Sequence, residues 1–92
     1  MTVYLSVEPG VIDTGECATW TIETDHPDAA DAWWFGTGID VGGSHVAGWY
    51  SPFYWAANYC YQGPWSGVRM VCVYDADGYI IECSNQVYFN VV

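Results

Sequence analysis

Apolar and polar residues alternate with a period of two along much of the chain, most clearly in residues 2–7 and 16–24. The apolar positions are Val3, Leu5 and Val7 in the first segment and Ala18, Trp20 and Ile22 in the second. Successive side chains of a strand point to opposite faces, so each segment presents one apolar face. Gly, Pro, Asp and Asn separate such runs, and no stretch shows a clean helical period with caps. The pattern predicts an all-β fold.

The centre of the chain is less regular. A third strand is expected at residues 32–35, Ala-Trp-Trp-Phe, and it ends at the Gly-Thr-Gly of 36–38. Its two adjacent tryptophans must point to opposite faces. Residues 39–44 are rich in glycine, and residues 46–61 are dense in aromatic side chains and include Pro52. Because proline cannot donate a ladder hydrogen bond, the latter segment predicts short edge strands or an irregular wall.

A hairpin is predicted near the C-terminus. Residues 68–74 and those from 79 onward flank Asp77-Gly78, a pair typical of a type I′ turn because both central residues need positive φ. This turn sets Ala76 opposite Tyr79, Tyr74 opposite Ile81, and Cys72 opposite Cys83. The last pair falls near the Cα spacing that a disulfide requires, so the register predicts a Cys72–Cys83 bond.

The same register divides the hairpin into two faces. The face expected in the core carries Met70, Cys72, Tyr74, Ile81, Cys83, Val87, Phe89 and Val91. The other face carries Arg69, Asp75 and Glu82, and Val71, Val73 and Ile80 are then expected to point outward, as candidates for a packed interface. A bulge at Ser84-Asn85 is expected before residues 86–92 complete the last strand.

The length of 92 residues predicts a single domain spanning 1–92. A chain this short buries only about 60 to 65% of its unfolded surface, so additional cross-links are expected. The four cysteines form no CxxC pair, and the two histidines lie far apart in the chain. That spacing favours two disulfides over a zinc site, with buried free cysteines in a reducing cell as the alternative.

A series of motifs extends over nearly the whole chain. They are Pro9-Gly10 and Thr14-Gly15-Glu16, an inward Trp20, the segment Trp33-Trp34-Phe35-Gly36-Thr37-Gly38, the run from Gly67 to Asp77-Gly78, and the closing residues 87–91. This set resembles bacterial and phage immunoglobulin-like domains, including the polycystic-kidney-disease type. Their third strand typically reads Trp-x-Phe-Gly-Asp-Gly, whereas Thr37 stands at the Asp position here, and the aromatic middle has no counterpart. The resemblance implies a small antiparallel immunoglobulin-like β-sandwich of about seven strands with a C-terminal hairpin, used as a spacer, adhesin segment or virion appendage.

The resemblance also implies a second disulfide. In that topology the start of the second strand and the end of the fifth lie at the same pole, which implies a Cys17–Cys60 bond. The rival pairing, Cys17–Cys72, is the one that antibody-type domains use. It is disfavoured because Cys17 falls on the Thr19 and Glu23 face of its strand, near the start.

The charge balance excludes several partners. Eleven acidic residues face one basic residue, Arg69, giving a formal net charge of −10. Nucleic acids and anionic membrane surfaces would be repelled. No apolar run approaches 18 residues, and residues 1–9 lack the features of a signal peptide. Oxidised cysteines then indicate an extracellular or cell-surface location, either as a domain of a longer secreted protein or as a virion component.

Catalytic chemistry is not expected. Ser44-His45 is a dipeptide in a glycine-rich loop without a nucleophile elbow or a second base, so no enzyme activity and no cofactor are predicted. Carboxylates gather in two turns, and the weak calcium candidates are Asp25, Asp28, Asp31, Asp75 and Asp77, near Glu82. Turn geometry by itself accounts for Asp in such positions, so no metal is predicted.

The aromatic content carries the functional expectation. Trp, Tyr and Phe make up 18% of the chain, and a small core cannot enclose all of these rings. The predicted binding surface consists of Trp49, Tyr50, Tyr54, Trp55, Tyr59, Tyr61 and Trp65, with Phe53 in the same segment. Such rings suit protein–protein contact or self-association in a surface assembly, which is the leading hypothesis. The alternative is a carbohydrate-binding module that stacks exposed Trp and Tyr on sugars.

Overall fold

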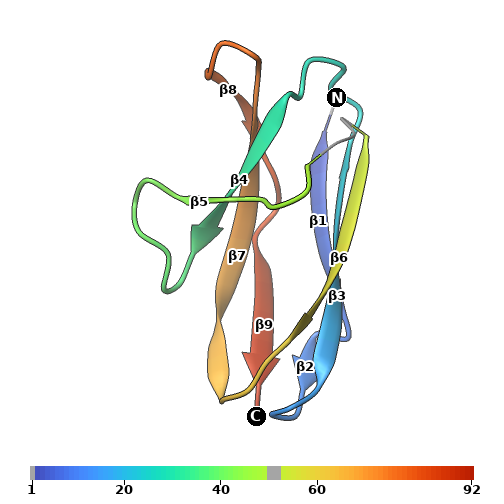
Figure 1. Cartoon of the computed structure of the whole chain (residues 1–92), viewed down its shortest axis with the longest axis vertical. Helices are drawn as coiled ribbons and strands as arrows, with labels where there is room; N and C mark the ends of the chain where they lie inside the picture. Colours follow the sequence, from blue (N-terminus) through green and yellow to red (C-terminus); the bar gives the residue numbers. More distant parts are fainter. Residues whose placement is uncertain (1, 50–52) are drawn as a thin grey trace.

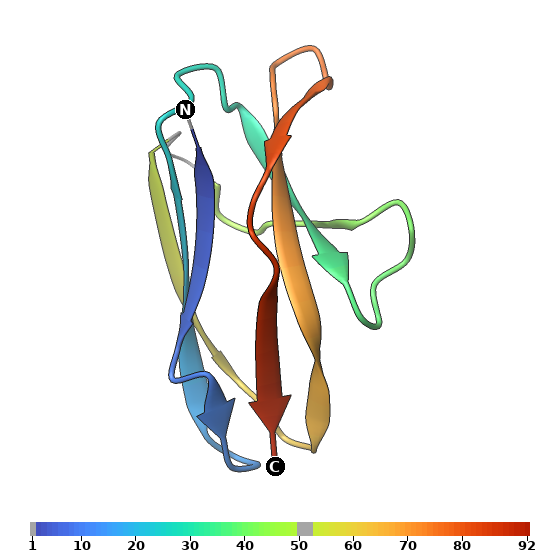
Figure 2. The ribbon, with the colours of Figure 1, turned by 180° about the vertical axis from the view of Figure 1, so that it is seen from behind.

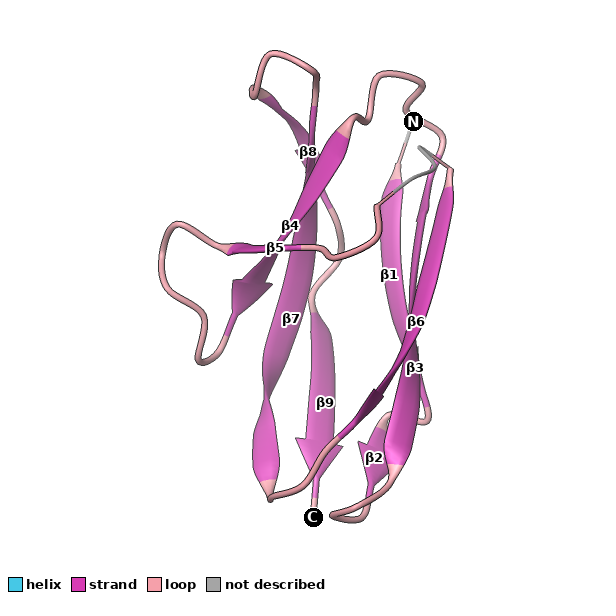
Figure 3. Ribbon diagram, in the orientation of Figure 1, coloured by secondary structure: helices cyan, strands magenta, loops and turns pink. Residues whose placement is uncertain are grey.

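Two packed β-sheets form the protein in a computed structural model that describes residues 2–49 and 53–92 (Figure 1). The smaller sheet has the order β1-β3-β6, from β1 (Val3–Glu8), β3 (Cys17–Thr24) and β6 (Tyr54–Cys60). The larger has the order β2-β9-β7-β4-β5, from β2 (Val11–Ile12), β9 (Val87–Val91), β7 (Trp65–Tyr74), β4 (Asp31–Gly36) and β5 (Ser44–His45). A further strand, β8 (Ile80–Cys83), also pairs with β7. The described residues contain no helix (Figure 3), which confirms the prediction of an all-β sandwich.

Antiparallel pairing predominates in both sheets. Figure 2 shows β9 beside β7, with β2 along the other side of β9. The β2–β9 pair is parallel, whereas the remaining pairs are antiparallel. This short parallel pair lets the N-terminal segment contact the larger sheet after β1 has paired in the smaller one.

The core lies between the two sheets. Leu5 and Ile22 fill it from the smaller sheet, and Phe89 fills it from the larger one. Trp20 places its indole edge-on against the Phe89 ring, with 5.2 Å between ring centroids. The alternation predicted for residues 2–7 and 16–24 is therefore the one that fills the core, and burying each of these side chains stabilises the fold by about 1.5 to 3 kcal/mol.

The aromatic middle of the chain is more regular than expected. Residues 54–60 form β6, a seven-residue edge strand that pairs with β3 along its whole length. Its core-facing ring is Trp55, which lies opposite Ile22. The prediction of an edge strand is confirmed, whereas an irregular wall is wrong for this part. Pro52 lies outside the described residues.

The hairpin turn differs from the predicted type I′. Positive φ is confined to glycine among the described residues, so Asp77 does not have it, whereas Gly78 does at 85°. The amide of Asp75 donates to the carbonyl of Tyr79, at 2.9 Å, and closes a three-residue loop. The Asp75 carboxylate accepts the amides of Asp77 and Tyr79 at 2.9 and 3.0 Å. This Asx-type arrangement keeps Asp77 at an ordinary φ and leaves the left-handed position to Gly78.

A bulge then restores the predicted cysteine pair. Tyr74 lies opposite Ile80, not Ile81, and the register shifts by one residue before Val73 meets Glu82. Cys72 therefore still lies opposite Cys83. Both predicted disulfides, Cys72–Cys83 and Cys17–Cys60, are present, and no described cysteine is free.

The predicted inward face of β7 is wrong. Val71 and Val73 are fully buried in the core, so they are not the outward interface candidates expected. A second register shift explains the inversion. Val87 pairs with Arg69, whereas continuing the β8 register would pair it with Val68. The shift falls in segment 84–86, the place where a bulge was expected. As a result, Cys83 of β8 pairs with an even-numbered residue of β7, Cys72, whereas Val87 of β9 pairs with an odd-numbered one, Arg69.

This inversion has consequences for the remaining side chains. Met70, Cys72 and Tyr74 lie on the side of the larger sheet that faces away from the core, because they alternate with Val71 and Val73. Arg69 lies on the inner side instead. The Cys72–Cys83 bond therefore lies on the outer side, next to Trp33 in the pairing register. Ile80 is 56% exposed, as predicted.

Candidate functional site

The predicted aromatic surface separates into buried and exposed rings. Trp55 is only 6% exposed and belongs to the core, so its assignment to the binding surface is wrong. Its indole lies edge-on to Trp34, with 5.7 Å between centroids, and donates to the carbonyl of Ala47 at 2.9 Å. The physical reason is strand parity, since the core-facing position opposite Ile22 falls on this residue.

The other predicted rings occupy intermediate or exposed positions. Trp49, Tyr61 and Trp65 are partly buried and pack against the core. Tyr54 and Tyr59 are 58% and 37% exposed, so they remain available to a partner. Phe53 is exposed as well, and Tyr50 lies outside the described residues.

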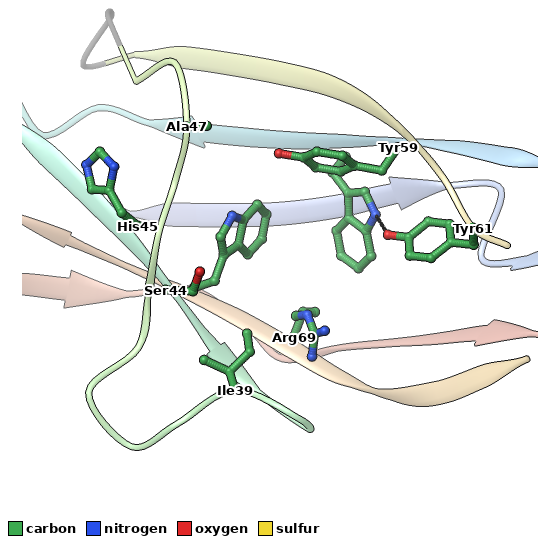
Figure 4. Close-up of a pocket in the computed structure, with 9 residues that line it drawn as sticks. Ile39, Ser44, His45, Ala47, Tyr59, Tyr61 and Arg69 are labelled. Atoms are coloured by element: carbon green, nitrogen blue, oxygen red, sulfur yellow. Dashed lines mark hydrogen bonds between the residues drawn. The ribbon is translucent and has the colours of Figure 1, made fainter. Parts of the chain in front are cut away.

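A cleft of about 310 Å³ opens between the two sheets, beside the segment that leads from β4 through β5 toward β6 (Figure 4). Its lining residues are Trp20, Trp34, Ile39, Ser44, His45, Ala47, Tyr59, Tyr61 and Arg69. Small-molecule pockets typically range from about 300 to 1,000 Å³, so the cleft is at the lower end and suits a ligand of one ring. Of the predicted surface residues, the fold brings Tyr59 and Tyr61 together here.

The aromatic wall of the cleft is held by specific contacts. The Trp20 indole donates to the hydroxyl of Tyr61 at 2.9 Å, and this bond is drawn in Figure 4. Trp20 also lies edge-on to Trp34, with 5.8 Å between centroids. Burial, and to a lesser degree the neighbouring Tyr61, raises the pKa of the Tyr59 hydroxyl. The Tyr59 side chain therefore stays protonated near neutral pH and keeps a hydroxyl donor.

Arg69 reaches this cleft from the inner side of β7. Its Nη1 donates to the carbonyls of Thr37 and Val68. The guanidinium also lies over the Trp65 ring, with its Cζ atom 4.4 Å from the centroid, in a cation–π contact. Burial lowers the pKa of Arg69 from its ordinary value, which still leaves the side chain charged at neutral pH.

The Arg69 position depends on a close backbone approach. Gly36 lies opposite Arg69 and has a φ of 141°, and a Cβ there would lie 2.1 Å from the carbonyl oxygen of Val68. Glycine is therefore required at this position. The Thr37 carbonyl that follows it is the one that accepts from Arg69.

Sequence reasoning missed most of this cleft. Arg69 was expected on the solvent side, and Trp20 and Trp34 were not considered as ligand contacts. One signal was available, because a single basic residue beside eleven acidic ones is conspicuous. Because the register on β7 shifts by one residue between β8 and β9, the sequence did not indicate that the Arg69 side chain points toward the inner side of the sheet.

A second feature is the outer face of the larger sheet, defined by the side chains on its side away from the core. Its apolar members are Trp33, Phe35, Val68, Met70, Cys72, Tyr74 and Tyr88, and the register places neighbouring members in direct cross-strand pairs. Asp31, Ser66 and Asn90 lie on the same side at the ends of this apolar set. Cys72 is buried, Tyr88 is 62% exposed, and the other apolar members have intermediate exposure. In the part of the chain that the structure describes, the smaller sheet covers only the opposite side. The outer face is therefore apolar at positions where a solvated sheet usually carries polar residues.

The calcium candidates serve as turn and pairing groups. Asp25 accepts the amide of Thr2 at 2.7 Å, and this bond lowers its pKa. Asp31 contacts the Nε2 of His45, and Asp75 holds the hairpin loop. Asp28 and Asp77 are exposed on their loops. Among the described residues, no group of three or more His, Cys, Asp or Glu side chains is arranged to hold a metal ion.

Ser44 and His45 do not form a nucleophile–base pair within the described residues. The ring of His45 pairs with Asp31 and lies edge-on to Trp33, with 5.1 Å between centroids. No hydrogen bond joins its ring to the Ser44 hydroxyl in this part of the chain. Ser44 and His45 instead contribute polar atoms to the lining of the cleft.

Comparisons with known proteins identify no family for this chain, because no protein-family model and no curated protein matches it. The described residues also include no helix capable of crossing a membrane.

Proposed function

We propose that this chain is a non-catalytic, immunoglobulin-like recognition module of an extracellular, cell-surface or virion assembly, and that it acts through protein–protein contact. The strand order supports the immunoglobulin-like assignment. The central part of the larger sheet is β4-β7-β9, and the smaller sheet is β1-β3-β6. In chain order these correspond to the C-F-G and A-B-E strands of an immunoglobulin-like sandwich.

The outer face of the larger sheet is the observation that carries the proposal. Strand β7 is apolar on both sides, with Val71 and Val73 in the core and Val68, Met70 and Tyr74 on the outer face. Strands with two apolar sides are typical of sheets covered on both sides. Here the outer side meets solvent, and contiguous exposed apolar surface marks an interaction site.

Charge complementarity favours a basic protein partner over a second copy. Two chains of this composition would each bring a formal net charge of −10. Self-association would place these charges side by side, whereas a basic rim on a partner would be attracted and steered toward the face. The apolar centre of the face would then supply the buried contact.

The disulfides support the extracellular assignment. Two disulfides in a domain of 92 residues are typical of proteins that fold in an oxidising environment. The cytosol would keep such thiols reduced.

A selection of displayed peptides tests the proposed interface. We expect disulfide-constrained peptides selected on the immobilised domain to be rich in Lys or Arg and in aromatic residues, because they must match an acidic rim and an apolar centre. Their affinity should fall at least about tenfold on Met70→Glu, which places a charge in the centre of the outer face. It should also fall with added salt.

The matched control is Thr21→Glu, which places the same charge at a central, solvent-facing position of the smaller sheet. That variant should bind the selected peptides as the unmodified domain does. The proposal would be contradicted by selected peptides whose affinity is unchanged by Met70→Glu but falls on Thr21→Glu. Sedimentation of the domain alone provides a second check, since dimerisation abolished by Met70→Glu would replace the basic partner with a second copy.

A further inference from the structure

The cleft beside Arg69 has an unusual charge distribution for this protein. Its lining includes the only Lys or Arg side chain of the chain, and none of the eleven acidic residues is among the described residues that line it. The Asp31 carboxylate lies next to this lining, because it pairs with the ring of His45, whereas the Arg69 guanidinium pairs with none of the described carboxylates. The cleft is thus a local positive site on an acidic molecule, separate from the outer face of the larger sheet.

We propose that this cleft binds a single acidic monosaccharide unit, a pyranose that carries one carboxylate, such as a terminal uronic or sialic acid residue. The proposal goes beyond the protein contact of the outer face and does not depend on it. The two sites lie on opposite sides of β7, because Arg69 is on the inner side and Met70 on the outer.

The aromatic lining suits the apolar C–H face of a pyranose. Trp34 and Tyr59 line the cleft with ring surface that is not fully buried, and Trp20, which is 2% exposed, also belongs to the lining. Trp20 and Tyr59 belong to strands of the smaller sheet and Trp34 to a strand of the larger one, and all three line the cleft shown in Figure 4. Aromatic side chains combine a large apolar surface with low conformational entropy, so they bind flat ligands well.

Hydroxyl groups around these rings suit the polar edge of the sugar. Tyr61 accepts from the Trp20 indole, and in the described part of the chain its own hydroxyl proton has no acceptor. Tyr59 and Ser44 add two further hydroxyls to the lining. A sugar hydroxyl both donates and accepts, so it matches such groups without leaving a buried polar atom unpaired.

Arg69 determines the expected preference for an acidic sugar. Its Nη1 is occupied by the carbonyls of Thr37 and Val68, which fixes the orientation of the guanidinium. The remaining N–H groups donate to no described acceptor. A held guanidinium with free N–H groups is suited to a carboxylate, because the planar fork matches its two oxygens.

The overall charge limits the ligand to one acidic unit. At physiological ionic strength, charges more than about 8 Å apart at the surface are largely screened. A single carboxylate inside the cleft would meet a lining that includes Arg69 and, among the described residues, no acidic side chain. A polyuronate or another polyanion would extend across the acidic surface and be repelled.

Paired glycosides test the proposal by two-dimensional ¹H–¹⁵N NMR titration. The acidic probes are the methyl glycosides of glucuronic, galacturonic and N-acetylneuraminic acid, and the neutral ones are methyl glucoside and methyl galactoside. We expect at least one acidic probe to bind roughly tenfold more tightly than the neutral ones, as one charge-assisted hydrogen bond would give. The indole resonances of Trp20 and Trp34 should shift, and the backbone amide of Tyr4, an exposed residue of β1 outside the cleft, should not.

Variants separate a role in binding from a role in folding. Arg69→Met should abolish the preference for the acidic probe, and Arg69→Lys should keep part of it. Because Arg69 also holds the Thr37 carbonyl, Tyr59→Phe is the second variant. It removes one lining hydroxyl and should weaken acidic and neutral probes alike. Tyr54→Phe, on the same strand but outside the cleft, is the matched control and should leave binding unchanged.

The outcomes that would overturn the proposal are distinct. Equal affinity for acidic and neutral probes would mean that the cleft does not recognise the carboxylate. If none of the probes shifts the Trp20 and Trp34 resonances at about 20 mM, well above a Kd of 1 mM, the cleft is not a monosaccharide site. Neither result bears on the outer-face proposal, which Met70→Glu tests.

Discussion

Individual tryptophans in this protein have different roles that depend on strand parity. Trp55 and Tyr54 are neighbours in β6, yet Trp55 is 6% exposed and Tyr54 is 58% exposed. Trp33 and Trp34 both have intermediate exposure but point to opposite sides of the larger sheet, and Trp34 contacts the core rings Trp20 and Trp55. An aromatic residue is therefore a core residue or a surface residue according to the side of the sheet on which it falls.

The first prediction concerns this neighbouring pair. Trp55→Ala should lower the free energy of unfolding by about 3 to 5 kcal/mol, since it removes a buried ring and leaves a cavity among packed aromatics. Tyr54→Ala should lower it by no more than about 0.5 kcal/mol. Urea unfolding followed by fluorescence, with both disulfides intact, measures each value. If Trp55→Ala does not fold, Trp55→Phe should still show a smaller loss. A Trp55→Ala variant as stable as Tyr54→Ala would contradict the core assignment.

At the level of elements, one disulfide joins strands that are distant in sequence, and the other joins strands that follow each other in the chain. Cys17–Cys60 links β3 to the end of β6 across 43 residues, whereas Cys72–Cys83 links β7 to β8 across 11. Cross-linking removes conformational entropy from the unfolded chain, and the effect grows with the length of the closed loop. The longer loop is also the one that ties the edge strand β6 to the centre of the smaller sheet.

The second prediction compares the two bonds. Replacing both Cys17 and Cys60 by Ala should lower the free energy of unfolding by about 4 kcal/mol, and the same change at Cys72 and Cys83 should lower it by about 3 kcal/mol. Urea unfolding of the two double variants, compared with the oxidised parent, measures the difference. The parent in reducing agent is the control, and it should lose at least as much as either variant. A larger loss from the hairpin pair would show that packing, not loop entropy, decides the effect.

Strand β7 has the greatest influence on the fold because it contacts most of the larger sheet. It pairs with β4, β8 and β9, and its two sides lead to different environments. Its inner side contributes Val71 and Val73 to the core and Arg69 to the cleft, while its outer side contributes the apolar face. Both proposed binding sites therefore depend on the orientation of one strand.

Electrostatic repulsion acts on the molecule as a whole. The formal net charge is −10, and the ion pairs among the described side chains are His26–Glu82 and His45–Asp31. Each of these pairs joins a carboxylate to a histidine ring, and neither uses the Arg69 guanidinium. Most carboxylates are thus uncompensated, and their mutual repulsion disfavours the compact state.

The third prediction follows from that repulsion. Raising the NaCl concentration from about 10 to about 150 mM shortens the Debye length from roughly 30 to 8 Å. The melting temperature should therefore rise by about 4 °C or more, the shift that about 1 kcal/mol gives in a domain of this size. Sodium sulfate at equal ionic strength is the control for ion-specific effects and should give a similar rise in this range. An unchanged or lower melting temperature would contradict repulsion as a destabilising factor.

The sequence alone determined the strands at residues 2–7 and 16–24 and the two cysteines that face each other in the hairpin. Alternation in residues 2–7 and 16–24 is unambiguous because one side is polar, so the core positions followed directly. The Cys72–Cys83 pair was predicted correctly even though the turn type was wrong. The three-residue loop and the bulge at Ile81 offset each other, so Cys72 still lies opposite Cys83.

Only the tertiary structure decided which side of β7 faces inward. Its alternating residues are apolar on both sides, so the period predicts a strand without assigning a direction. The direction depends on the one-residue shift in segment 84–86, where the Ser84 hydroxyl accepts the amide of Val71 at 3.0 Å. Such a shift satisfies hydrogen bonds between residues distant in sequence and inverts every side chain beyond it. Local pattern does not contain that information, and the Arg69 cleft and the apolar outer face exist because of it.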